Sequence, residues 1–391
     1  MLSTEFQPWP CFSGREIEAA GAVLKSGRVN YWTGTEGKEF EKEFAAWCGT
    51  KHAVALANGT LALEACWRAL GLGAGDEVIV TPRTFLASAT SIINVGATPV
   101  FADVDRDSQN ITPETAARVV TSKTRAILCV HLAGWPCEME SFKALAAAHG
   151  LYLVEDCAQA HGAAYYGKMV GSFGDISAWS FCQDKIMTTG GEGGMITTND
   201  RGLWSKVWAY KDHGKSWEAV HEREHPPGFR WLHESIGSNW RMVEMQAAIG
   251  RVQLQEMPAW QAARERNSSA ILDAARGLSG LRVPQIPNHI RHAWYKAYAF
   301  VRPEALKADW PRDRIIAEIN GRGVPCYQGS CSEIYLERAF DHVPGRPKER
   351  LPAAKELGET SLMFLVHPTL RDGEIAKTCD VLRDVMMMAQ R

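Results

Sequence analysis

Short apolar runs alternate with amphipathic stretches from residue 52 to about residue 156. The runs lack the period-two alternation of half-exposed strands, so they predict strands buried on both faces, with helices between them. The expected strands are 52–57, 77–80, 99–104, 126–131 and 151–154, and the expected helices are 60–70, 85–95, 113–120 and 141–149. Strands that alternate with helices predict an α/β fold, a mainly parallel sheet flanked by helices.

The pattern changes after residue 156. Two short runs, 175–181 and 195–198, are typical of strands and enclose a loop rich in Thr and Gly. Residues 211–237 are charged and contain many His, Trp and Pro residues, which predicts an irregular surface excursion. Apolar residues at 242, 245, 249, 252 and 254 predict a helix over 241–255. Pro258 is expected to bend or end it, with helical character resuming to about residue 275.

Beyond residue 280 helices and strands are mixed. One strand is expected at 298–301, and helices are expected at 312–320, 353–357 and 372–386. A chain of 391 residues is long for a single core. We therefore predict a large α/β domain over residues 1–255 and a small C-terminal α+β domain over residues 256–391, with the boundary in or just after the long helix.

Composition excludes several classes of protein. The formal net charge is −2 and no dense Lys/Arg block occurs, so non-specific nucleic-acid binding has no electrostatic support. Ten cysteines are scattered without a CxxC pair, which indicates reduced, mostly buried thiols in a cytosolic protein. The N-terminus lacks the pattern of a signal peptide, and no apolar stretch approaches the length of a membrane span. A cytoplasmic protein is expected.

A first polar cluster, Asn58-Gly59-Thr60, lies where an expected strand turns into a helix. Glycine lets the backbone approach a ligand, and the free amides of a helix N-terminus suit a phosphate. The same three residues could also form an ordinary turn with a Thr cap. On its own, this cluster only permits a phosphate site.

A second cluster centres on Asp156, at the carboxyl end of an apolar strand. Open α/β sheets bind ligands at this end, and a carboxylate there can pair with a cationic heterocycle such as a pyridinium. The alternative is a helix N-cap.

The third cluster surrounds Lys185, in a loop between apolar strands. Ser180 lies five residues upstream and could offer a hydroxyl to a phosphate, and a glycine-rich turn follows the lysine. An amine that is desolvated or has cationic neighbours can lose its proton and form a Schiff base. Most lysines are simply solvated. A fourth cluster contains Asn239, just before the long helix, where it could be a plain N-cap.

The four clusters in this order resemble the DegT/DnrJ/StrS-type sugar aminotransferases, a branch of the fold-type I pyridoxal-phosphate enzymes. The matching pieces extend over nearly two hundred residues. They are NGTLAL at 58–63, TPRTFLASA at 81–89, HLAG at 131–134, VEDCAQAHGA at 154–163, GSFGDISAWSFCQDKIMTTGGEGGMITTND at 171–200 and GSNWRMVEMQAAIG at 237–250. The resemblance implies a fold-type I transferase whose large domain binds pyridoxal 5′-phosphate.

By this resemblance, four residues would contact the cofactor ring. Lys185 would hold it as a Schiff base, and Asp156 would pair with the pyridine nitrogen. Gln159 would donate a hydrogen bond to the phenolic oxygen, and Phe85 would stack on the ring face. Lys185 and Asp156 would be the catalytic residues.

The resemblance also implies a phosphate site. Gly59, Thr60 and Ser180 would hold the phosphate, and Asn239 would reach it from a neighbouring subunit. The chain would then be a homodimer with shared active sites. Two stretches depart from the family pattern. These are Cys182-Gln183-Asp184 before the lysine and the HLAGW loop, where the family faces its substrate.

The implied reaction moves an amino group from glutamate to a keto-sugar, most often nucleotide-linked, through the pyridoxamine 5′-phosphate form of the cofactor. Such amino-sugars enter lipopolysaccharide and other surface polysaccharides. A keto-cyclitol or a free keto-sugar acid would use the same chemistry, so both remain alternatives.

Rival classes fit the sequence less well. Dehydratases of the family replace the lysine with His, and a non-enzymatic cofactor-binding sensor would not need the complete set. A Rossmann oxidoreductase is disfavoured because GLGAGD at 71–76 precedes a strand and opens no helix. No Cys/His cluster has the spacing of zinc ligands, so no metal is expected. His131, His161 and His367 are interpreted as structural.

Overall fold

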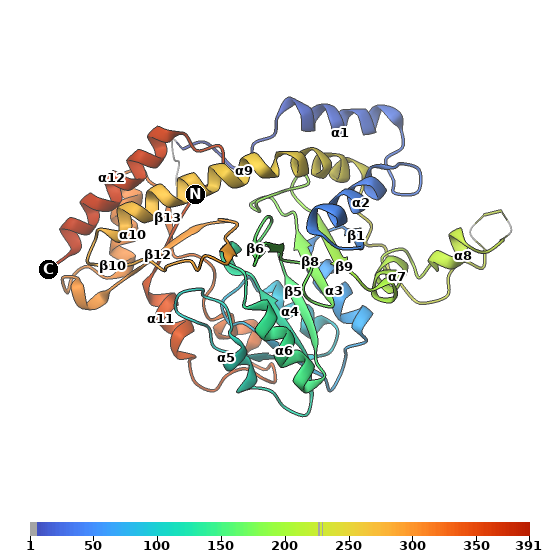
Figure 1. Ribbon diagram of the computed structural model, residues 1–391, viewed down its shortest axis with the longest axis horizontal. Helices are drawn as coiled ribbons and strands as arrows, with labels where there is room; N and C mark the ends of the chain where they lie inside the picture. Colours follow the sequence, from blue (N-terminus) through green and yellow to red (C-terminus); the bar gives the residue numbers. More distant parts are fainter. Residues whose placement is uncertain (1–5, 226, 229) are drawn as a thin grey trace.

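The computed structural model describes residues 6–225, 227–228 and 230–391. Its centre is a seven-stranded sheet with the order β1-β9-β8-β5-β4-β2-β3 (Figure 1). The pairs from β8 to β3 are parallel, and β9 is antiparallel to both neighbours. The strands are β1 (His52–Leu56), β2 (Glu77–Val80), β3 (Thr98–Phe101), β4 (Thr124–Val130), β5 (Tyr152–Asp156), β8 (Ile176–Ser180) and β9 (Gly194–Thr198).

Both faces of this sheet are covered, because successive side chains of one strand point to opposite faces. In β2, Val78 and Val80 pack in one buried cluster with helices α3, α4 and α7, while Ile79 packs in another with α5 and α6. These helices are α3 (Gly59–Leu70), α4 (Ala87–Asn94), α5 (Pro113–Ala117), α6 (Met139–His149) and α7 (Arg201–Tyr210). The predicted mainly parallel sheet between helices is confirmed.

Two N-terminal helices were not anticipated, α1 (Gly14–Ser26) and α2 (Glu36–Cys48). A capping box begins α1: the Ser13 side chain accepts the N–H of Arg15, and the Glu16 carboxylate accepts the N–H of Ser13 at 3.0 Å. Gly27, with φ of 68°, ends the helix in the left-handed conformation. The start and stop signals were therefore present in the sequence, although the apolar face is narrow.

The long helix α9 (Glu244–Arg276) is a single 33-residue element with Pro258 inside it. The alternative that Pro258 ends the helix is therefore wrong, and the expected helical character up to about residue 275 is confirmed. Its N-terminal part packs on α1 and α2, and its C-terminal part packs on α12 (Asp372–Ala389) and β12 (Ala297–Val301). Pro258 is exposed. The helix therefore loses one hydrogen bond at an exposed proline while packing on both sides of it continues.

The C-terminal region contains a four-stranded antiparallel sheet with the order β10-β12-β14-β13. Helices α10 and α12 pack on it, and its core includes Phe6 from the N-terminus. A three-stranded sheet, β11-β6-β7, lies beside the large sheet. The remaining bounds are β6 (Ala164–Tyr165), β7 (Lys168–Met169), β10 (Leu281–Arg282), β11 (Ile290–Arg291), β13 (Cys326–Tyr327), β14 (Ser361–Phe364), α10 (Arg312–Gly321) and α11 (Pro352–Thr360).

One C-terminal segment returns to the large sheet. Ile334, Tyr335 and Phe340 are buried with Phe101 of β3 in the core of the seven-stranded sheet. The four-stranded sheet and its helices form the predicted smaller C-terminal domain. The division between the two domains at residues 255 and 256 stays a prediction.

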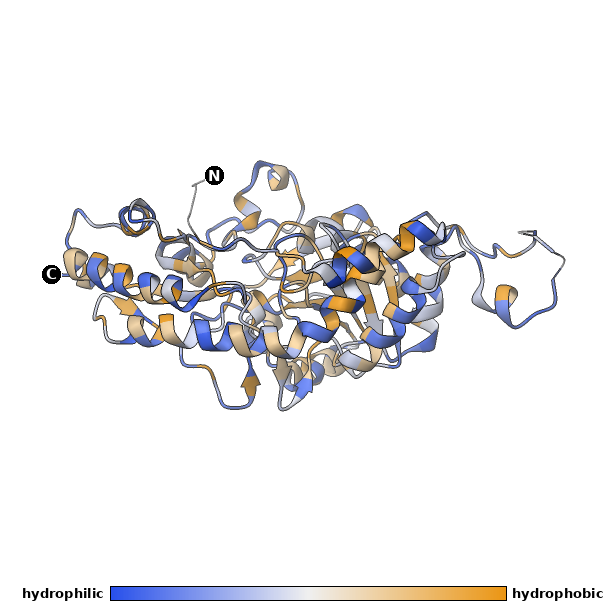
Figure 2. Cartoon of the chain, turned by 90° about the horizontal axis from the view of Figure 1, so that it is seen from above, coloured by the Kyte–Doolittle hydropathy of each residue, from blue (hydrophilic) through white to orange (hydrophobic). Residues whose placement is uncertain are grey.

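The excursion after α7 protrudes from the body of the molecule (Figures 1 and 2). Its described residues contain one short helix, α8 (Trp217–His221), and are otherwise irregular, as predicted. In the described residues no helix combines the length and the apolar character that crossing a membrane requires.

Candidate active site

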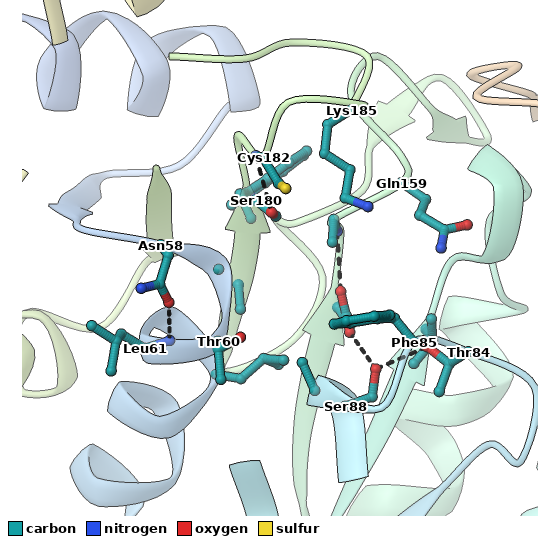
Figure 3. A pocket seen from close by; sticks show the side chains of 18 of the residues that line it. Asn58, Thr60, Leu61, Thr84, Phe85, Ser88, Gln159, Ser180, Cys182 and Lys185 are labelled. Atoms are coloured by element: carbon teal, nitrogen blue, oxygen red, sulfur yellow. Dashed lines mark hydrogen bonds between the residues drawn. The ribbon is translucent and has the colours of Figure 1, made fainter. Parts of the chain in front are cut away.

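A pocket of about 500 Å³ lies at the carboxyl ends of β1, β5 and β8. Seven of the eight residues singled out in the sequence line it (Figure 3). They are Gly59, Thr60, Phe85, Asp156, Gln159, Ser180 and Lys185. Parallel strands all end at the same edge of the sheet, which is why motifs separated by more than a hundred residues meet here.

The N-terminus of α3 forms one end of the pocket. Asn58 caps the helix by accepting the Leu61 N–H at 2.9 Å, and the amides of Gly59 and Thr60 have no acceptor within the described part of the chain. A Cβ at Gly59 would lie 2.6 Å from Cβ of Ser180, so only glycine lets the serine approach the helix end. Free amides, a helix dipole and a hydroxyl fit a phosphate group.

Asp156 lies at the bottom of the pocket and is 5% exposed. One carboxylate oxygen accepts the hydroxyl of Ser88 at 2.8 Å, and the other accepts the N–H of Ala158 at 3.1 Å. Burial raises the pKa of Asp156 above its ordinary value, despite the opposing effect of these hydrogen bonds and of Lys185. A cation beside this carboxylate would favour its ionised form, and a pyridinium nitrogen fits that role.

The hydrogen bonds around Gln159 show which of its amide atoms accepts and which can donate. Its Oε1 accepts the backbone N–H of Ala133 at 2.8 Å, which leaves Nε2 as the group that can donate into the pocket. Phe85 is 67% exposed although it is a large apolar side chain, because its ring faces the cavity. A hydrogen-bond donor and an apolar ring face suit a phenolic oxygen and an aromatic heterocycle.

Lys185 reaches into the pocket from the loop after β8, on the same side as Gln159 (Figure 3). Its side chain is 14% exposed, and its Nζ lies 3.4 Å from Oδ1 of Asp184. The loop is fixed at its backbone: the Lys185 N–H donates to Cys182 O at 3.0 Å, and the Trp9 indole donates to Lys185 O at 2.8 Å. The amine is therefore held at the pocket and has little access to solvent.

Tyr295 contacts the pocket residue Asp184, and sequence reasoning missed it. Its hydroxyl donates to the carboxylate of Asp184, and the Nζ of Lys185 lies 5.2 Å from its ring centre. Burial alone would raise the pKa of Asp184, but Lys185, Tyr295 and Lys296 together lower it. No motif marks Tyr295, which comes 110 residues after Lys185. Ser88 was also missed, although its place one turn after Thr84 in TPRTFLASA was a usable signal.

Asn239 does not line the pocket. It is exposed, next to the excursion, and its backbone forms an isolated bridge with Asp212. Within one chain it is therefore separate from the other candidate residues, and its predicted contact from a neighbouring subunit stays a prediction.

His131 and Glu155 form a buried pair behind the pocket. His131 Nε2 lies 3.0 Å from Glu155, and its Nδ1 accepts the N–H of Cys137 at 3.0 Å. Glu155 also accepts three backbone N–H groups of residues 171–174, each at 2.8 Å. Cys157 lies close enough for a three-residue metal cluster, with ligand atoms within 4.8 Å of one another. Glu155 already accepts hydrogen bonds from the backbone of the turn after β7. We therefore interpret the cluster as structural support for that turn.

The pocket thus offers a partner for each part of pyridoxal phosphate, and fold and site together place the protein among the pyridoxal-phosphate-dependent aminotransferases. Its family follows from the whole sequence. The chain belongs to the DegT/DnrJ/EryC1/StrS aminotransferase family, whose model matches residues 10–383.

Individual relatives are similar to this chain over nearly its full length. An aminotransferase from Psychrobacter cryohalolentis, solved by X-ray crystallography, has 59% identity and a TM-score of 0.96, covering 98% of this chain and 99% of that chain. GDP-perosamine synthase of Escherichia coli O157:H7 is 41% identical over 96% of each chain. DesV of S. venezuelae, solved with a ketimine intermediate, is 32% identical, with a TM-score of 0.84 and coverage of 95% and 94%.

Proposed function

We propose that this enzyme transfers the amino group of L-glutamate to a keto-sugar carried on a nucleotide, for amino-sugar biosynthesis. The observation that carries the proposal is the convergence of Lys185, Asp156 and Gln159 in one pocket of a chain that is 41% identical to GDP-perosamine synthase. The name of that relative supports a nucleotide-linked sugar. Glutamate is proposed as the donor by analogy with the family.

When bound, pyridoxal phosphate supplies an electron sink for the carbon that carries the transferred nitrogen. Lys185 Nζ, an amine that lines this pocket, would move a proton between that carbon and the cofactor as general base and general acid. Asp184, fixed by the Tyr295 hydroxyl, holds the amine when it is protonated. Asp156 would keep the ring nitrogen of the cofactor protonated, and Gln159 Nε2 would donate a hydrogen bond to its phenolic oxygen.

A half-reaction experiment tests the proposal. Glutamate should bleach the visible absorbance of the cofactor-loaded enzyme with release of 2-oxoglutarate, and the correct keto-sugar should restore the absorbance. The acceptor panel contains keto-sugars linked to GDP, UDP and dTDP, a keto-cyclitol and a free keto-sugar acid. Recovery only with the keto-cyclitol or the free keto-sugar acid would show that the acceptor is not a nucleotide-linked sugar. A lack of bleaching by glutamate would refute glutamate as the donor.

We also propose that two chains share their active sites through Asn239. Its exposure beside the protruding excursion supports a role outside its own pocket. A mixed dimer of Lys185→Ala and Asn239→Ala chains contains one pocket with both residues intact. The purified mixed dimer should therefore have about half of the wild-type activity, and an equal mixture of freely exchanging chains about a quarter. Mixed chains that stay as weak as the separate variants would refute the shared site.

A further inference from the structure

A second pocket of about 390 Å³ opens from the cofactor pocket toward the C-terminal region. The two pockets share Thr84, Phe85, Gln159, Asp184 and Lys185. The other lining residues all come from the C-terminal region; they are Tyr295, Lys296, Tyr327, Gly329, Ser330, Cys331, Met363 and Leu365. A substrate that reaches the Lys185 amine can therefore extend into this second pocket.

The second pocket is cationic. Two lysines and one aspartate line it, and the aspartate is already engaged by Lys185 and the Tyr295 hydroxyl. Lys296 has no ion pair and no hydrogen bond to its amine among residues 6–225, 227–228 and 230–391. Its Nζ lies 4.8 Å from the centre of the Tyr295 ring, and the Lys185 Nζ lies 5.2 Å from the same centre. An unpaired amine thus lies over the same ring as the reacting amine.

Two buried guanidinium groups lie next to residues of this pocket without lining it: Arg264 contacts the carbonyl of Tyr295, and Arg83 precedes Thr84. Arg264 is 1% exposed, and its only hydrogen bonds in the described structure go from NH1 to the carbonyls of Trp294 and Tyr295. Arg83 is 0% exposed, and both of its terminal nitrogens lack a partner in the described residues. Neither has a carboxylate partner to offset its charge. Buried positive charge of this kind favours an anionic ligand.

Lys296 is itself poised to respond to an anion. Burial, followed by the charges of Arg264 and Lys185, lowers its pKa to about 8, and Asp184 opposes this shift. An anion beside the amine would favour its charged form and raise this pKa again.

We propose that Lys296 binds a carboxylate group of the substrate in the second pocket. A carboxylate suits the site better than a diphosphate, because one lysine can pair with one negative charge. Every amino-acid donor carries its carboxylate on the carbon that bears the reacting nitrogen, so that group must lie close to the Lys185 amine. The inference rests on the proposed function for the identity of the donor. A carboxylated sugar acceptor is the other source of the same chemistry.

The first test compares cofactor-loaded Lys296→Met, Lys296→Arg and wild-type enzymes. Methionine keeps an unbranched side chain of similar length and removes the charge together with its hydrogen-bond donors. We expect the glutamate concentration for half-maximal bleaching to rise about 10- to 100-fold in the Met variant, the effect of one charge-assisted hydrogen bond. The Arg variant should recover most of this loss. Lys143→Met, at an exposed position of α6, is the matched control and should behave as wild type.

The two sources of the carboxylate are separated by the half-reaction that changes. A defect confined to bleaching by glutamate assigns the subsite to the donor, and a defect confined to recovery by the keto-sugar assigns it to the acceptor. Unchanged concentration dependence in both half-reactions overturns the subsite. If wild-type enzyme completes both half-reactions normally and Lys296→Met equals it in both, the subsite fails while the proposed function stands.

A binding measurement tests the subsite without turnover. Succinate should bind the cofactor-loaded wild-type enzyme in calorimetry, with proton uptake near pH 8, and should bind the Met variant at least 10-fold more weakly. Thermal unfolding distinguishes a purely structural lysine. Removing an unpaired buried charge should leave the melting temperature unchanged or higher. A lower melting temperature together with unchanged succinate binding would overturn the proposal.

Discussion

Replacing Asp156 with Asn removes one charge and leaves the hydrogen bonds possible. The Asn carbonyl can still accept the N–H of Ala158, now 3.1 Å from the carboxylate. The Asn amide takes the place of the oxygen that accepts from Ser88, and it donates to that hydroxyl instead. Ser88 can make this exchange because its hydroxyl lies 2.9 Å from that of Thr84 and can donate there. The substitution therefore isolates the charge.

The effect of Asp156→Asn on stability has opposite signs in the cofactor-free and the cofactor-loaded enzyme. Without cofactor, burial raises the pKa of Asp156, so its ionised form opposes folding at neutral pH. This cost appears as the pH rises above the unfolded carboxyl pKa of about 4 and is complete above the folded pKa. The cofactor-free Asn variant should thus be no less stable than wild type at pH 7.5, and the difference should vanish near pH 4.

With cofactor, the Asn variant loses the partner of a buried pyridinium. Losing one member of such a pair costs about 2–5 kcal/mol, roughly 30- to 4,000-fold in affinity. Thermal unfolding with and without saturating cofactor measures this directly, because the stabilisation follows the ratio of cofactor concentration to Kd. Asp175→Asn, an exposed carboxylate outside the pocket, should keep the full cofactor-induced stabilisation. A cofactor-free Asp156→Asn protein that is markedly less stable, or an unchanged cofactor effect, would refute the reasoning.

Three further substitutions have defined outcomes. Lys185→Ala should fold and abolish turnover, measured as product release under saturating substrates; wild-type turnover without added amines would contradict its role. Gly59→Ala brings a Cβ to 2.6 Å from Cβ of Ser180, so cofactor affinity should fall by about 1–3 kcal/mol; unchanged affinity by titration would contradict the close approach. Pro258→Ala, at an exposed position of α9, restores an N–H that can donate to the carbonyl of Leu254. The free energy of unfolding, measured with denaturant, should rise by about 1–3 kcal/mol. A lower free energy of unfolding would show that the proline ring is needed.

The large sheet could be predicted from the sequence because its strands are buried on both faces. Strand β2 was expected at 77–80 and has those bounds, and the other strands of the sheet differ by a few residues. The two-residue strands of the smaller sheets could not be predicted, because two residues carry no periodicity. Their positions depend on partners distant in the chain, as for β11 and β6.

The cofactor side of the pocket was predictable, and the substrate side was not. Gly59, Asp156 and Lys185 each lie at the end of a strand or its loop, so a motif and its position come together in the sequence. Tyr295 and Lys296 lie in the bend just before β12, a strand of another sheet, and only tertiary packing brings them to Lys185. The pattern of residues around 295 contains no signal for that contact.

Helix α9 also determines how this chain can be divided. Because it extends unbroken from one core to the other, a cut near residue 255 would leave each fragment with an apolar helix face and no partner for it. The two cores should therefore unfold in one cooperative transition. A functional split enzyme should instead be cut at the exposed residues 222–225 after α8, where few packed contacts would be lost.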